Sequence, residues 1–326
     1  MQHLSRLGNT ISISIPAGED RLIGRECPNP VCKGYFKIEL GTGLEGENLP
    51  CTCAYCGQSA GHEEFLTTEQ IEYVKSIAFR QISDAVYKDL KTLEFDSKPS
   101  RSFGLGISLK VDRPQSLPIY RYREKELETE LICSNCTLRY SVFGIFAFCP
   151  DCGQHNSIQI LEKNLEIITR LLDLSVGMQA EISEKLVENA LEDCVSAFDG
   201  FAREVCRIHA AKAVRSVRSN RLSFQNLATA KKHMAQLFNI DLSKEISPEQ
   251  WRASSLCFQK RHLVAHRMGV MDDNYVRKSS DPDAVLGQKV QITRREVRQF
   301  IEFLSSLATQ MTQALRDLSP KHGTRE

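Results

Sequence analysis

The chain contains no apolar stretch long enough to cross a bilayer as a helix. Residues 1–25 also lack the pattern of a secretory signal, which needs a charged start, an apolar core and a small-residue cleavage site. Together these absences predict a protein with no membrane partner. They also predict a cytoplasmic location, where thiols stay reduced.

Motifs of several enzyme classes are missing too. The sequence has no glycine-rich phosphate loop, no serine nucleophile elbow and no paired-carboxylate motif. The net charge is only +1, so the chain as a whole has no field that would draw it onto nucleic acid. One local basic segment carries a single acid, Glu204, among six cations: Arg203, Arg207, Lys212, Arg215, Arg218 and Arg221. This segment predicts either phosphate contacts or a solvated helix face.

Cysteine is abundant, and eight of the 12 cysteines fall into two sets of four. The later set has two short pairs separated by twelve residues, which is typical of a zinc ribbon. Its members are Cys133, Cys136, Cys149 and Cys152. In the earlier set Cys27 and Cys32 form the first pair, and three thiols compete for the second pair. We choose Cys53 and Cys56 and leave Cys51 out.

Each set predicts one structural Zn²⁺ ion, because four thiolates leave no coordination position open for water or substrate. Disulfide bonding is the alternative, and it would need an oxidising compartment. His62 and His155 lie near the two sets in the sequence, but neither is needed to complete a site, so we interpret both as surface residues. We interpret Cys194, Cys206 and Cys257 as core residues of helices.

The apolar pattern predicts an α+β protein with two small zinc ribbons and an intervening helix, followed by an all-α antiparallel four-helix bundle. Alternating residues at 10–15 and 35–40 predict short strands around the first ribbon, and a capping box at 67–70 starts the intervening helix. The predicted domains are zinc ribbon 1 at 1–64, helix and linker at 65–118, zinc ribbon 2 at 119–156 and the helical domain at 157–326. The four bundle helices are predicted at 182–208, 224–238, 247–267 and 293–311.

A basic motif lies near the end of the third bundle helix, where Arg261 and His262 are followed by His266. Arginine is a permanent cation whose planar fork matches phosphate oxygens, and histidine can take up and return a proton near neutral pH. Such a pair can cleave RNA without metal if His266 deprotonates the ribose 2′-hydroxyl and Arg261 stabilises the phosphorane. Five helical steps place the two side chains about 140° apart, so two copies related by a two-fold axis would form one composite cleft. The alternative is a surface arginine and a helix-end histidine.

Several segments carry a resemblance to HEPN domains: Ser223–Leu227, Trp251, Phe258–His266, Gly269–Tyr275 and Lys289–Ile292. The resemblance covers about residues 157–318 and says nothing about the ribbon half. It implies a ribonuclease motif formed by Arg261, the polar residue His262 and His266. It also implies a metal-independent endoribonuclease of the toxin or anti-phage defence type, active as a homodimer, with an antitoxin or another defence-system protein as partner.

The leading hypothesis from the sequence is therefore an RNA-cleaving helical domain whose ribbon half recognises the substrate or a partner. A binding module that holds nucleic acid or protein without catalysis is the main alternative, and His266→Ala would separate the two. A zinc-ribbon transcription regulator is a third hypothesis, but the sequence offers no recognition helix for it.

Overall fold

The computed structural model describes residues 2–46, 48–97, 107–113, 115, 117–215 and 222–318. The chain divides into two compact units, Met1–Gln154 and His155–Glu326. Part of the predicted linker at 96–118 lies outside the described residues, as do Arg218 and Arg221 of the basic segment. Within the described part of the chain, no helix has the length and apolar character to cross a membrane.

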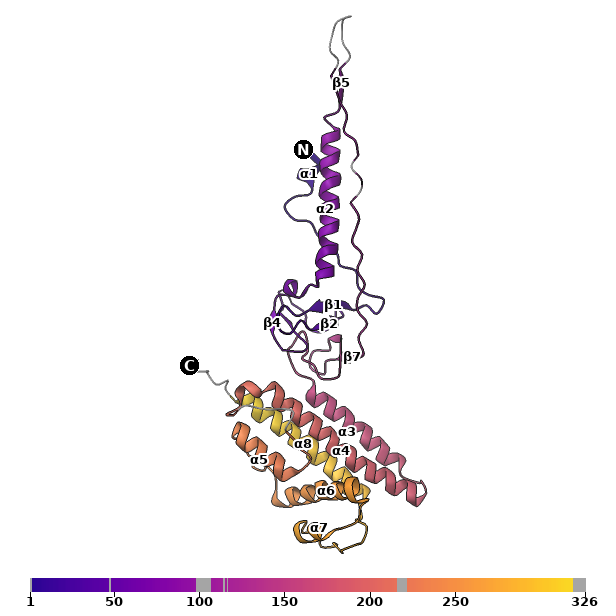
Figure 1. The fold of residues 1–326 in the computed structure, drawn as a ribbon, viewed down its shortest axis with the longest axis vertical. Coiled ribbons are helices and arrows are strands. Elements are labelled where there is room, and N and C mark those ends of the chain that lie inside the picture. Colours follow the sequence, from indigo (N-terminus) through magenta and orange to yellow (C-terminus); the bar gives the residue numbers. More distant parts are fainter. Residues whose placement is uncertain are drawn as a thin grey trace, which may run out of the picture. The chain divides into compact units, whose positions relative to one another are not determined.

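The first unit is built on one antiparallel sheet of four short strands in the order β1-β2-β8-β7 (Figure 1). Strands β1 (Ile23–Glu26) and β2 (Tyr35–Ile38) come from the first cysteine-rich segment. Strands β7 (Thr129–Ile132) and β8 (Arg139–Val142) come from the second. Because β2 pairs with β8, strands from the two cysteine-rich segments form one continuous sheet.

The alternation at residues 10–15 predicted a strand, but no regular structure forms there. The side chains of this segment are exposed or only partly buried, so its alternating apolar residues do not pack against a hydrophobic core. The strand that pairs with β2 is β1, a little further along the chain. The prediction for residues 35–40 is confirmed by β2, whose four residues are all buried.

A long helix, α2 (Thr68–Lys91), lies between the two pairs of strands in the sequence. It begins at the predicted capping box, in which the Thr67 side chain accepts from the backbone N–H of Gln70. Near its other end the Asp89 carboxylate accepts the backbone N–H groups of His3 and Leu4. Those contacts satisfy donors at the start of the short helix α1 (Gln2–Arg6) and attach it to α2.

The remaining elements of the first unit are short. The two-stranded sheets are β3 (Cys51–Thr52) with β4 (Ser59–Ala60), and β5 (Phe95–Ser97) with β6 (Ile107–Leu109). A 3-10 turn, η1 (His62–Phe65), precedes α2.

The second unit is helical. Its elements are α3 (Ser157–Leu174), α4 (Ala180–Ile208), η2 (Ala210–Lys212), α5 (Leu227–Phe238), α6 (Pro248–Arg267), α7 (Asp273–Lys278) and α8 (Arg294–Asp317). The four predicted bundle helices correspond to α4, α5, α6 and α8. The predicted helical range 157–326 holds a further long helix that was not predicted, α3, which packs against α4 and α8.

Aromatic side chains join three of these helices in the core. The ring of Phe258 on α6 meets Phe198 of α4 and Phe300 of α8 in edge-on contacts, with centroids 6.3 and 5.2 Å apart. Cys194, Cys206 and Cys257 are buried in this core, as predicted from their places in the helical stripes. The core therefore fixes α6, which carries the arginine and histidine motif, against two long neighbours.

Candidate metal centres and the arginine and histidine site

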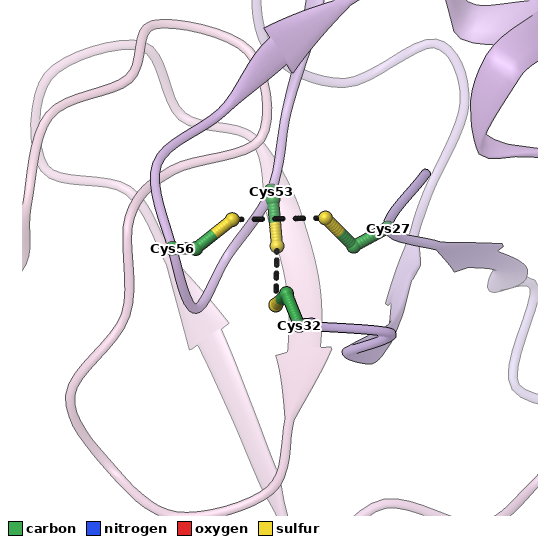
Figure 2. A group of neighbouring side chains, drawn as sticks. All are labelled: Cys27, Cys32, Cys53 and Cys56. Atoms are coloured by element: carbon green, nitrogen blue, oxygen red, sulfur yellow. Dashed lines mark hydrogen bonds between the residues drawn. The ribbon is translucent and has the colours of Figure 1, made fainter. Parts of the chain in front are cut away.

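The first cysteine set forms a compact cluster of four thiols (Figure 2). Cys27 and Cys32 lie between β1 and β2, and Cys53 and Cys56 lie between β3 and β4. All four sulfur atoms are within 4.8 Å of one another. The closest pairs are Cys27 with Cys56 at 3.6 Å and Cys32 with Cys53 at 3.7 Å.

The second set has the same arrangement. The Sγ atoms of Cys133 and Cys152 are 3.6 Å apart, and those of Cys136 and Cys149 are 3.4 Å apart. A tetrahedral Zn²⁺ ion with Zn–S bonds of about 2.3 Å separates its sulfur ligands by about 3.8 Å. Both clusters approach that separation, and all eight cysteines are free thiols. The two groups are thus compatible with two structural zinc ions.

Backbone geometry explains how such short segments converge. In each of the four cysteine pairs the residue after the second cysteine has a positive φ: Lys33, Gly57, Thr137 and Gly153. In three of the pairs the N–H of this residue returns to the carbonyl of the first cysteine, whereas the N–H of Lys33 donates to the carbonyl of Asn29. For example, the N–H groups of Gly57 and Gly153 donate to the carbonyls of Cys53 and Cys149, each at 3.0 Å. Glycine suits this conformation because it carries no Cβ.

Burial affects the chemistry of these thiols. It raises the pKa values of Cys53 and Cys136 to about 11. Without a metal these thiols are therefore protonated at neutral pH, and a bound cation would have to displace their protons. Release of thiol protons on metal binding is characteristic of thiolate metal sites.

Cys51 lies outside the first cluster, as the sequence analysis expected. It is fully buried in β3, and burial raises its pKa to about 12, although the nearby guanidinium of Arg25 acts in the opposite direction. Cys53, two residues further on, is the member of this trio that joins Cys27, Cys32 and Cys56.

The interpretation of His155 as a surface residue was wrong. Its side chain is buried, and Nε2 lies 3.1 Å from Oε1 of Glu204 on α4. Its Nδ1 accepts the backbone N–H of Ser157 at the start of α3, which leaves Nε2 as the donor to Glu204. Burial alone would raise the pKa of Glu204, but hydrogen bonds from Arg207 and His155 outweigh it and hold this pKa at about 2. His62, in contrast, is partly exposed.

The basic motif lies on the last two turns of α6. His262 and His266 are both exposed, and their ring centroids are 4.7 Å apart. Partial burial, with smaller contributions from the neighbouring His266 and Arg261, lowers the pKa of His262 below the ordinary histidine value and so favours its neutral form. The structure therefore places the two histidines together as a pair at the surface of the helix.

Arg261 has a different neighbourhood. Its Nη1 donates to Oε1 of Gln225, at 3.1 Å, in the segment before α5. Among the residues that the structure describes, no hydrogen bond joins Arg261 to His266. Within one chain Arg261 is thus held by Gln225, while His266 lies beside His262.

Gln225 belongs to a larger polar network centred on Asp199 of α4. The Asp199 carboxylate accepts the backbone N–H of Phe224 at 2.5 Å and the side-chain amide of Gln225 at 3.5 Å, and it forms an ion pair with Arg203 at 2.6 Å. The sequence analysis assigned no role to Asp199 or Gln225. A signal was present, because Asp199 is an acid inside the apolar stripe of a core helix.

Two further cations of the basic segment, Arg207 and Lys212, are engaged in structural contacts. Arg207 makes two hydrogen bonds to Glu204, at 2.7 and 2.6 Å. Lys212 donates to the backbone carbonyls of Leu315 and Arg316 near the end of α8, where the helix dipole favours a cation. Neither side chain is an isolated cation on a solvated face.

Comparisons with protein-family models, with curated proteins and with solved structures find no match for this chain. The sequence and the structure therefore define a class only in coarse terms: a chain with small antiparallel sheets, two four-cysteine groups compatible with zinc, and a helical unit.

Proposed function

We propose that the protein is a metal-independent endoribonuclease whose helical unit is a HEPN domain. The observation that supports this best is the surface of α6, where His262 and His266 lie beside each other and Arg261 is held by Gln225. Two structural zinc ions would stabilise the first unit, which would recognise RNA or a partner protein. An antitoxin or another defence-system protein would then control the activity.

The proposed reaction is transesterification at ribose. His266 takes the proton of the 2′-hydroxyl, and the oxygen attacks the adjacent phosphorus. Arg261 stabilises the added negative charge on the phosphorane. The bond to the 5′ oxygen then breaks, and this oxygen receives the proton that His266 took from the 2′-hydroxyl. The products are a 2′,3′-cyclic phosphate and a 5′-hydroxyl.

A homodimer completes this proposal. Arg261 and His266 face different directions on one helix, so a two-fold axis would bring Arg261 of one copy toward His266 of the other. Because Arg261 and His266 face different directions within one chain, a competing proposal is also supported. In that proposal a zinc-ribbon and HEPN module binds nucleic acid or protein and has no catalytic activity.

Cleavage of labelled RNA in the presence of a chelator separates these two proposals. We expect His266→Ala and Arg261→Ala to lower the rate by about 10²-fold or more, because each removes a group that acts in the transition state. Arg267→Ala is the matched control, since Arg267 is an exposed neighbouring cation whose Nε is 3.8 Å from Asp272. It should stay within a few-fold of wild type. Cleavage by His266→Ala at the wild-type rate would contradict the nuclease proposal.

A further inference from the structure

Two arginines from different helices meet at one carboxylate and amide unit. Arg203 of α4 forms an ion pair with Oδ2 of Asp199 at 2.6 Å. The same oxygen accepts the Gln225 amide at 3.5 Å, and the other end of that amide accepts from Arg261. The side chains of Asp199 and Gln225 therefore link the two guanidinium groups in one chain of polar contacts.

The charges of this cluster do not cancel. Asp199 supplies one negative charge for the two arginines, and Gln225 is neutral. Arg207, one turn after Arg203, differs because its guanidinium has its own carboxylate, Glu204, in a two-point contact. The cluster around Asp199 therefore retains an excess positive charge that Arg207 lacks.

The cluster is also buried at its base and open at its edge. The Asp199 side chain is only 8% exposed, whereas that of Arg203 is 41% exposed. The Nε atoms of Arg203 and Arg261 are buried, and in the described part of the chain neither has a hydrogen-bond partner. Leaving buried donors unpaired costs stability, and such groups are often retained at functional sites.

We propose that Arg203 is a second phosphate-binding residue of the nuclease site, and that it contacts the RNA backbone next to the phosphate held by Arg261. This inference rests on the proposed function and extends it to a helix outside the HEPN motif. Guanidinium forks bind phosphate oxygens in two-point contacts, and a carboxylate behind them fixes their direction. In this scheme Asp199 holds Arg203 from the core side and leaves its outer edge for the phosphate.

Binding of a fully 2′-O-methylated RNA oligonucleotide tests this inference, because that probe has phosphates but no ribose nucleophile. We compare Arg203→Met with Arg207→Met, since both substitutions keep the apolar stem and remove one cation. Arg203→Met should raise the dissociation constant about tenfold and should lower the slope of log K against log salt by about 0.7, the value for one phosphate contact on a single strand. Arg207→Met should change the dissociation constant by less than about twofold. Equal effects of the two substitutions, or an unchanged slope for Arg203→Met, would overturn the inference.

A second variant keeps the test decisive if Arg203→Met fails to fold. Arg203→Lys retains a cation for Asp199, so it should retain the wild-type salt slope while the lost fork weakens binding a few-fold. A slope reduced in Arg203→Lys as well would contradict phosphate binding by this side chain. The outcome is independent of cleavage. Arg203-dependent binding without nuclease activity would reject the nuclease alone, and nuclease activity without Arg203-dependent binding would reject this inference alone.

Discussion

Replacing Cys53 by alanine should remove one metal ion, whereas replacing Cys51 by alanine should remove none. Both thiols are fully buried and lie two residues apart, but only Cys53 belongs to the four-thiol cluster. Structural zinc contributes on the order of 10 kcal/mol to the folding of a small domain. Because whole domains are stable by only about 5–15 kcal/mol, loss of one ion should unfold much of the first unit. Cys51→Ala leaves only a small cavity, at a cost of about 1–2 kcal/mol.

Metal content and thermal unfolding measure this difference directly. Mass spectrometry of metals in gel-filtered protein should find two zinc ions per chain in the wild type and in Cys51→Ala, and one or none in Cys53→Ala. The unfolding transition of the first unit should be present in Cys51→Ala and absent or strongly lowered in Cys53→Ala. Equal zinc content in the two variants would refute the assignment of Cys53 as a ligand. Iron in place of zinc would refute the assignment of the bound ion as zinc.

Two further predictions concern the helical unit. Gln225→Leu removes the acceptor that holds Arg261, so kcat for RNA cleavage should fall at least about tenfold while KM and the unfolding temperature change little; a rise in KM alone would contradict a role in positioning. Glu204→Gln should cost on the order of 2 kcal/mol at pH 7, because Arg207 and His155 lower the pKa of Glu204 to about 2. That contribution is fully present above the ordinary glutamate pKa and is lost as the pH falls toward 2, so urea unfolding should show a smaller difference from wild type at pH 3 than at pH 7.

The two four-thiol clusters could be predicted from the sequence because their geometry is local. A short cysteine pair followed by a left-handed residue places two thiols close together, and only two such pairs are needed to complete a set of four thiols. The choice of Cys53 over Cys51 follows the same reasoning, since Cys53 has the spacing of a pair with Cys56. Likewise, the caps at Thr67, Ser247 and Thr293 depend on residues at most three positions away.

Contacts between distant segments could not be predicted in this way. The pairing of Ile38 with Tyr140 joins residues about a hundred positions apart, and nothing in either short strand specifies the other. The burial of His155 depends on Glu204 of another helix, and the contact of Arg261 with Gln225 depends on how α6 packs near the start of α5. Helix α3 differs, because Leu161, Leu165, Ile168 and Leu172 follow helical spacing and could have indicated it.

We propose that the surface of α6 cleaves RNA through the ribose 2′-hydroxyl. The most direct test uses an oligonucleotide with a single ribose among 2′-O-methyl nucleotides, incubated with the protein in the presence of a chelator, followed by mass spectrometry of the products. We expect one cut, on the 3′ side of that ribose, with a 2′,3′-cyclic phosphate on one product and a 5′-hydroxyl on the other, and no cut by His266→Ala. Cleavage at methylated positions, or products with 5′-phosphate ends, would contradict it.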